Sequence, residues 1–300
     1  MIFEVSHKTT CNYTAPVALA HHLVHLAPRP HERQRVMHQS ISVSPAPTSR
    51  NDFTDYFGNP ASTVAIQSRH SKLLIHSRSV VEVTAPAAID LAASMPWDRL
   101  AAELAPPKKI ADPDAVQFLM PSRHTAITED LIAYAKPTFK PGRPIMECAH
   151  DLMRRIFTEF AYDGAATDIA TTTDELLKIR RGVCQDFAHL LIAAMRAFGL
   201  PARYVSGYLL THPPEGKERL VGADASHAWV SVWSPDAGWV DFDPTNDLIP
   251  RDEHITIAYG RDFQDVSPVT GILLGGGAHD ADVAVYVKPI EKQAANVRPV

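Results

Sequence analysis

Cysteine is scarce in this sequence, and its pattern argues against two kinds of stabilised fold. The 300 residues include three cysteines, Cys11, Cys148 and Cys184. Because the number is odd and no Cys-x-x-Cys spacing occurs, a disulfide framework and a four-ligand zinc site are both disfavoured. We therefore expect free thiols in a reducing compartment.

Basic excess and long apolar runs are lacking as well. The formal net charge is −5, and the dispersed Lys and Arg residues create no basic field that would attract nucleic acid or an anionic membrane surface. Residues 1–8 contain no basic segment followed by an apolar run, and the apolar stretch 190–195 is too short to span a bilayer. We expect a soluble, cytoplasmic protein with a protein or peptide substrate and no nucleic-acid or membrane partner. No feature of the sequence indicates an oligomeric state.

Length and composition favour about two domains with a sizeable core. Residues 1–85 are predicted to form an N-terminal β module, because short β-rich runs such as 64–66 and 73–75 alternate with turn signals. Residues 86–121 are predicted to be a connection, because prolines break any long element there. These prolines are Pro86, Pro96, Pro106, Pro107, Pro113 and Pro121. Residues 122–300 are predicted to form the second unit, with strands at its C-terminal end.

Apolar spacing predicts two helices in the second unit. Residues 145–160 and 187–198 both carry apolar side chains at intervals of three and four, and Gly199 and Pro201 end the second stripe. The runs 204–209, 227–233 and 239–242 that follow are typical of strands. A buried helix followed by an antiparallel sheet predicts an α+β core.

Cys184 lies where the second apolar stripe begins, after the flexible Gly182. The predicted position is a helix N-terminus, where free backbone N–H groups and the helix dipole favour a thiolate over a thiol. A thiolate is what a cysteine nucleophile requires. The alternative is a small cysteine buried in the core.

A predicted hairpin brings a histidine and a carboxylate together. If Trp233 pairs with Trp239 across a five-residue loop, strand alternation places His227, Asp241 and Asp243 on one face. Asp243 is then the diagonal neighbour of His227, and Asp241 lies one pair farther away. The alternative for Asp243 is a turn residue ahead of a proline.

Three motifs now carry a resemblance. Gly-Val-Cys-Gln-Asp-Phe-Ala-His at 182–189, Ser-His-Ala-Trp-Val at 226–230 and Gly-Trp-Val-Asp-Phe-Asp-Pro-Thr at 238–245 resemble the bacterial transglutaminase-like family. Residues 26–29 and 55–59 resemble the N-terminal module of one bacterial subfamily. Residues 202–208 and 260–268 resemble its strand after the central helix and its C-terminal signature.

The resemblance implies a papain-like core, in which a central helix packs on an antiparallel sheet, and it implies no cofactor. It also implies a catalytic triad of Cys184 as nucleophile, His227 as general base and acid, and Asp243 as the residue that orients the histidine. In that chemistry the thiolate attacks an amide carbonyl, and a thioester forms on Cys184. The backbone N–H of Cys184 is one expected oxyanion donor, and the second is not identified.

Two fates of the thioester remain open. Transfer to an amine is transglutamination, and attack by water is peptidase or amidase chemistry. We favour hydrolysis, because nothing in the sequence identifies a dedicated amine-binding site. The alternative from another class is a non-catalytic module that uses the transglutaminase-like core to bind a protein partner.

Other candidate residues carry less chemistry. His21, His22 and His25 include an i, i+4 pair that suits a metal only on a helix, and no further ligand completes a site, so we predict no metal. His189, five residues after Cys184, is expected to be a hydrogen-bonded packing histidine, with a place in the site as the alternative. Cys11 and Cys148 are expected to be structural.

Two segments nearer the C-terminus carry charged residues and glycines. Arg261, Asp262 and Asp265 are interpreted as a charged turn near the mouth of the site. The run Gly275-Gly276-Gly277 lacks the Gly-Lys-Ser/Thr ending of a phosphate loop, so it predicts a tight turn.

Overall fold

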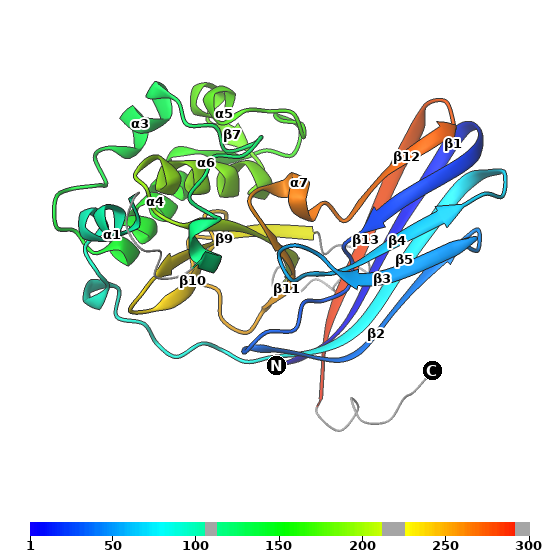
Figure 1. The fold of residues 1–300 in the computed structure, drawn as a ribbon, viewed down its shortest axis with the longest axis horizontal. Helices are drawn as coiled ribbons and strands as arrows, with labels where there is room; N and C mark the ends of the chain where they lie inside the picture. The colour runs from blue at the N-terminus through cyan, green and yellow to red at the C-terminus, as the bar shows by residue number, and fades with distance from the viewer. Residues whose placement is uncertain (106–112, 212–225, 292–300) are drawn as a thin grey trace, which may run out of the picture.

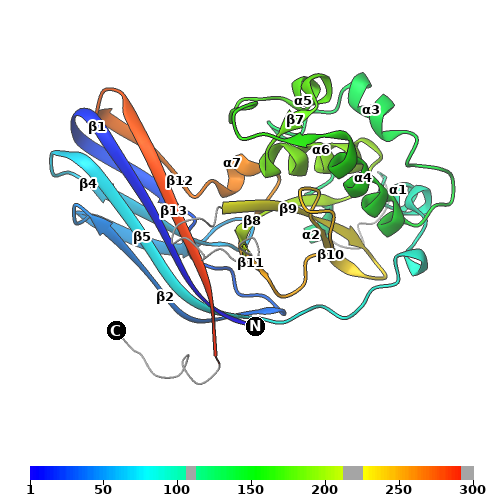
Figure 2. The same ribbon diagram turned by 180° about the vertical axis from the view of Figure 1, so that it is seen from behind.

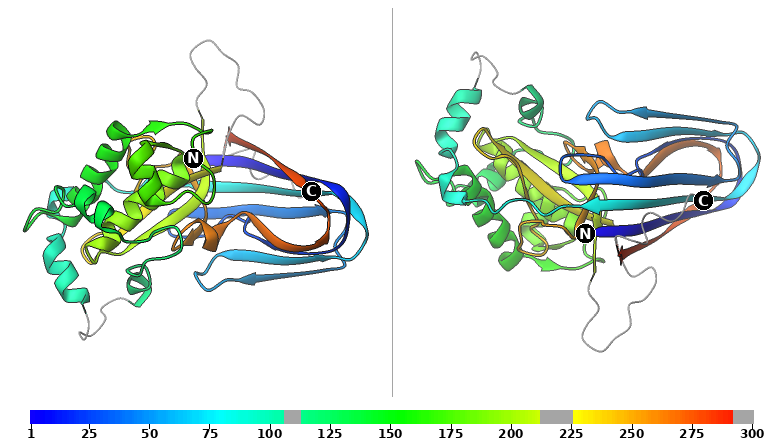
Figure 3. Two further views of the ribbon diagram at one scale, coloured as in Figure 1. Left: turned by 90° about the horizontal axis from the view of Figure 1, so that it is seen from above. Right: turned by 90° about the horizontal axis from the view of Figure 1, so that it is seen from below.

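The computed structural model describes residues 1–105, 113–211 and 226–291, which form a β-rich module beside an α+β core (Figure 1). Pro106 and Pro107 lie outside the described residues. Views from above and below show the long strands on one side of the molecule and the helices on the other (Figure 3). The predicted α+β class is confirmed. No helix within the described ranges is both long and apolar enough to cross a membrane.

The N-terminal module is a seven-stranded sheet built around one very long strand, β1 (Ile2–Val24). The path of the sheet is β2-β5-β1-β4-β3, and two C-terminal strands also pair with β1. The partners are β2 (Gln34–Ser44), β3 (Ser49–Thr54), β4 (Pro60–Ile66), β5 (His70–Val83), β12 (Val269–Gly275) and β13 (His279–Ile290). The predicted strands at 64–66 and 73–75 lie in β4 and β5.

The two C-terminal strands differ from their predicted place at the end of the core. Residues 2–13 of β1 pair with β13, and residues 17–24 of β1 pair with β12. Alternation along the sequence identifies such strands, but it carries no information about a pairing partner more than 200 residues away. Strands from both ends of the described chain therefore complete one sheet.

Three consecutive glycines join β12 to β13. Gly275, Gly276 and Gly277 all have positive φ, at 94°, 89° and 63°. Side chains rarely adopt that backbone region, so glycine is required for the turn. The predicted tight turn is confirmed.

The core consists of helices packed on a four-stranded antiparallel sheet of order β10-β9-β8-β11 (Figure 2). The strands are β8 (Ala202–Leu209), β9 (Ser226–Ser234), β10 (Gly238–Phe242) and β11 (His254–Gly260). Helix α6 (Cys184–Ala197) packs on β8 and β9, with α4 (Ile145–Glu159) beside it. Helix α6 is buried on almost all sides, since every residue from Asp186 to Arg196 is buried. Both predicted helices and all three predicted strand runs are present.

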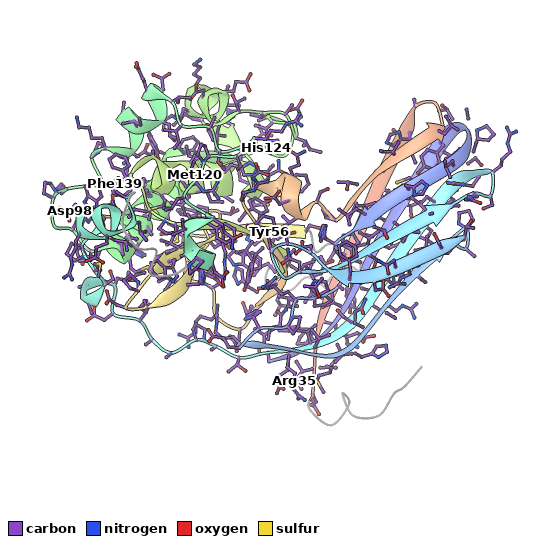
Figure 4. The ribbon with its side chains drawn as sticks, viewed as in Figure 1. Arg35, Tyr56, Asp98, Met120, His124 and Phe139 are labelled. Atoms are coloured by element: carbon purple, nitrogen blue, oxygen red, sulfur yellow. The ribbon has the colours of Figure 1, made fainter. Side chains whose placement is uncertain are left out.

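Short elements surround this core. They are η1 (Leu91–Ala93), α1 (Trp97–Leu104), α2 (Pro113–Val116), α3 (Glu129–Ala135), α5 (Thr173–Ile179), α7 (Phe263–Val266) and the two-residue strands β6 (Ala161–Tyr162) and β7 (Arg181–Gly182). The first three fall in or beside the predicted connection, where prolines keep them short. Asp98 and Phe139 lie at the end of the core farthest from the N-terminal sheet (Figure 4).

Gly207 in β8 lies where the core sheet leaves no room for a side chain. A Cβ at this position would lie 2.1 Å from the carbonyl oxygen of Ile255 and 2.5 Å from the Trp229 ring. Because a backbone oxygen cannot move aside alone, we expect Gly207→Ala to lower the free energy of unfolding by about 3 kcal/mol, as overpacking does. Chemical denaturation measures this. Gly164→Ala is the matched control, since nothing lies within 4 Å of its added Cβ, and equal stabilities for the two variants would contradict the packing.

Candidate active site

Cys184 is the first residue of α6, as predicted, and its side chain is half-buried. Val183 before it has an extended backbone, and the Val183 N–H donates to Asp186 Oδ2 at 2.9 Å. Thr167 donates to the same oxygen at 2.7 Å. A Cβ on Gly182 would lie 2.7 Å from Asp186 Oδ2. Glycine at 182 therefore leaves room for the carboxylate that caps the helix beside the thiol.

His227 and Asp243 meet through the predicted hairpin. The observed register pairs Trp239 with Trp233 and Asp241 with Ser231, as expected. Ser234 also pairs with Gly238. The connecting loop therefore comprises residues 235–237 instead of the five predicted, because the pairing continues one step closer to the turn.

The hairpin places His227 Nε2 2.8 Å from Asp243 Oδ2. Asp243 is completely buried, and it follows the last paired residue of β10 in a turn. Its Oδ1 accepts the backbone N–H groups of Thr245 at 3.0 Å and Asn246 at 3.3 Å. The carboxylate therefore belongs both to the turn ahead of Pro244 and to the histidine, so the two interpretations of Asp243 are compatible.

The surroundings of His227 favour its charged form. Burial opposes the charge, yet the Asp243 carboxylate, which accepts a hydrogen bond from the ring, and the neighbouring Cys184 raise the pKa of His227 to about 10. Burial also works against the Asp243 carboxylate, but its hydrogen bonds to His227 and His254 hold the pKa of Asp243 well below the usual range. Since Nε2 faces Asp243, Nδ1 is the ring nitrogen left for the thiol. The arrangement suits transfer of a proton between Cys184 and His227.

Two residues of this cluster were missed by sequence reasoning. His254, the first residue of β11, donates from Nε2 to Asp243 Oδ2 at 3.1 Å, and Asn246 Nδ2 donates to the same oxygen at 2.8 Å. Asn246 follows the Asp-Pro-Thr motif directly, so turn chemistry offered a signal for it. His254 comes from a different strand, and no local spacing indicates its approach.

Asp241 points to another partner. Its Oδ2 accepts from Arg33 Nη2 at 2.9 Å, which joins the core to the segment just before β2. It therefore forms an ion pair between the two modules, and of the two carboxylates it is Asp243 that is hydrogen-bonded to His227, as the register predicted.

His227, Asp243 and His254 are also the one cluster in the described ranges whose ligand atoms lie close enough, within 4.8 Å of one another, to hold a metal ion. However, Nε2 of His227 and Nε2 of His254 are both hydrogen-bonded to the same atom, Asp243 Oδ2. That oxygen therefore occupies the point toward which both nitrogens are directed. We interpret the cluster as a hydrogen-bond network.

The other predicted candidates lie outside the cluster. His21 and His22 are on a strand instead of a helix, and His25 is hydrogen-bonded to Asp55 at 3.2 Å. The helical spacing that a metal pair would need is therefore missing. Cys148 is buried in α4, and burial raises its pKa to about 12. Cys11 lies on β1, half-buried, and no cysteine forms a disulfide.

His189 is a packing histidine, as expected. Its Nε2 accepts the Phe263 N–H at 3.1 Å, its ring stacks on His124, and burial lowers its pKa to about 3. Arg261 forms an ion pair with Asp265 at 2.8 Å, and Asp262 caps the short helix α7. These charges stabilise the turn before α7.

Stability should report the charge on His227. Its folded pKa of about 10 lies above the ordinary 6.5, so the protonated ring stabilises the fold fully below pH 6.5 and loses this effect as the pH rises through about 10. We expect the loss of unfolding free energy in His227→Gln to be largest at pH 6 and to shrink by pH 10. Urea denaturation of both proteins across this range measures it, and a loss independent of pH would show that the ring is neutral.

The chain matches two sequence families. The bacterial transglutaminase-like N-terminal region matches residues 3–82, and the transglutaminase-like superfamily matches residues 132–244, a range that includes Cys184, His227 and Asp243. An uncharacterized protein of Mycobacterium tuberculosis is 39% identical over 300 residues, covering 97% of this chain and 94% of that protein. A protein-glutamine gamma-glutamyltransferase of Pseudomonas aeruginosa is 38% identical over 87 residues, which is 29% of this chain and 13% of that protein.

A solved structure shares the whole fold. A crystal structure from Cytophaga hutchinsonii, described as a candidate cysteine protease, superposes with a TM-score of 0.75 at 21% identity and covers 97% of this chain and 91% of that one. The likeness extends over both modules and confirms the papain-like arrangement of the core. The chain belongs to the transglutaminase-like superfamily and carries the bacterial transglutaminase-like N-terminal region before its core.

Proposed function

We propose that the protein is a thiol-dependent acyl-transfer enzyme that acts on protein or peptide amide bonds through a thioester on Cys184. One observation carries this proposal: the ring of His227 is hydrogen-bonded to Asp243 at 2.8 Å and neighbours the Cys184 thiol at the start of α6, and both groups raise its pKa. A nucleophile, a base and a group that orients the base is the arrangement that activates a thiol.

The proposed reaction has two stages. His227 takes the thiol proton, the Cys184 sulfur attacks the amide carbon, and the resulting imidazolium protonates the leaving amine. The oxyanion accepts a hydrogen bond from the backbone N–H of Cys184, a contribution typically of about 3 kcal/mol. Asp243 keeps the ring oriented and stabilises its charge. Water or a second amine then attacks the thioester, with His227 as general base, and releases the thiol.

Hydrolysis is the outcome we favour, because nothing in the sequence, and no group near the cluster in the part of the chain that the structure describes, identifies an amine-binding site. The similarity of 87 residues to a gamma-glutamyltransferase supports acyl transfer as the class of chemistry. It does not decide between water and an amine as the acceptor.

Peptide profiling with and without an added primary amine tests the proposal. New peptide termini, read by mass spectrometry, identify a peptidase, and incorporated amine identifies a transferase. Iodoacetamide labelling below neutral pH is the companion test: rapid labelling of Cys184 that is lost in His227→Ala supports an enzyme. Slow, uniform labelling of all three cysteines, with no change in any peptide, would favour a binding module instead.

A further inference from the structure

His254 binds the same carboxylate oxygen as His227. It is buried, and its ring lies nearly perpendicular to that of Trp229, with 5.1 Å between ring centres. Its Nδ1 is buried and has no hydrogen-bond partner among the described residues, whereas Nε2 lies 3.1 Å from Asp243 Oδ2. A proton on Nδ1 would be an unsatisfied buried donor. The contact to Asp243 is therefore donated by Nε2.

The Asp243 carboxylate is held from every side by these contacts. Oδ1 accepts two backbone N–H groups from its own turn, and Oδ2 accepts from His227, His254 and Asn246. The backbone groups and Asn246 belong to the turn that carries Asp243. His254 lies on a separate strand, β11, so its hydrogen bond ties the carboxylate to the core sheet.

The N-terminal module holds that strand. β11 is an edge strand of the core sheet, and two amide side chains bind its outer edge. Gln34 donates to the Thr256 carbonyl at 2.6 Å and accepts the Thr256 N–H at 2.8 Å. Asn59 makes the same pair of bonds with Tyr259, each of 2.8 Å. Each amide imitates one residue of a neighbouring strand, and Gln34 does so two residues after His254.

We propose that His254 is a positioning residue for the His227–Asp243 pair. The N-terminal module holds His254 in place through the two hydrogen bonds of Gln34 to β11. The proposal rests on the function proposed above, because it assigns His254 a role in maintaining the reactive thiol. The N-terminal module would then help to orient the His227–Asp243 pair. Figure 1 shows β11 on the side of the core sheet that faces that module.

The rate of iodoacetamide alkylation at Cys184, measured from pH 4 to 10 by peptide mass spectrometry, is the test. In His254→Leu the Asp243 carboxylate loses the hydrogen bond from His254 Nε2, so it holds the imidazolium of His227 less well. We expect the apparent pKa of the alkylation profile to rise. On the rising limb of the profile, a shift of one pH unit would lower the rate at a given pH by about tenfold. His254→Gln should restore most of the rate, because its amide nitrogen takes the place of Nε2. A purely structural role predicts no such shift and no rescue.

A double-mutant cycle tests the route through Gln34. Gln34→Met removes both bonds to Thr256, and we expect it to move the profile in the same direction. Its effect should largely disappear in the His254→Leu background, because residues that act through one another are not additive. Arg33→Met is the matched control: it breaks the ion pair to Asp241 next door and leaves β11 untouched, so its profile should equal that of the wild type. Gln34→Glu, which keeps the acceptor and the side-chain shape, covers the case in which Gln34→Met fails to fold.

Three outcomes separate the two proposals. If His254→Leu leaves the profile unchanged in a folded protein, the role of His254 is wrong while the enzyme assignment stands. If the effects of Gln34→Met and His254→Leu add fully, the route through β11 is wrong. If wild-type Cys184 labels no faster than Cys11 at pH 6, the proposed function fails, and the role of His254 fails with it.

Discussion

Cys184→Ala is expected to abolish turnover while leaving the free energy of unfolding almost unchanged. Removal of the nucleophile from a comparable catalytic unit lowers kcat by about 10⁶-fold. The side chain is half-buried at the first position of α6, and its loss removes one sulfur from a site where Gly182 and Asp186 already set the backbone. Turnover of a substrate identified by peptide profiling and urea denaturation of the same preparation measure the two effects.

Cys11→Ala is the matched control for this experiment. Cys11 is also half-buried, but it lies on β1 of the N-terminal module, so its replacement should leave turnover unchanged. Measurable turnover by Cys184→Ala, or an equal loss in both variants, would rule out Cys184 as the nucleophile.

Asp243→Asn is expected to lower kcat by about 10⁴-fold, as it does when the orienting carboxylate of a triad is replaced. Both oxygens of Asp243 accept hydrogen bonds, so the amide group of an asparagine would face another donor in either orientation. The ring of His227 would then lose its acceptor or change its tautomer. Steady-state kinetics on the identified substrate measures the loss.

Asp241→Asn provides the comparison, because the two carboxylates are separated by one residue on the same hairpin. Asp241 pairs with Arg33 at the junction of the modules, and a neutral acceptor there should lower stability by about 1 kcal/mol, as for a partly exposed ion pair. Its effect on kcat should be small. A larger kinetic loss in Asp241→Asn than in Asp243→Asn would contradict the orientation of His227 by Asp243.

The register of the hairpin follows from local spacing in the sequence. Side chains alternate along a strand, so pairing Trp233 with Trp239 places Asp241 opposite Ser231, as observed. The predicted loop is two residues longer than the observed one. The register is nevertheless the same, because Trp233 pairs with Trp239 in both cases. The start of α6 at Cys184 was predicted for a similar reason: apolar spacing and the glycine before it are local signals.

The sequence by itself determined the position of Cys184 at a helix start, the hairpin that joins His227 to Asp243, and the α+β order of the core. Each depends on residues a few positions apart, whose geometry the period of a helix or strand dictates. Only the tertiary structure decided that β12 and β13 complete the N-terminal sheet, and that His254 reaches Asp243 from a strand gripped by Gln34. Those contacts join separate elements, and their partners are selected by the packing of the whole chain, which no local spacing records.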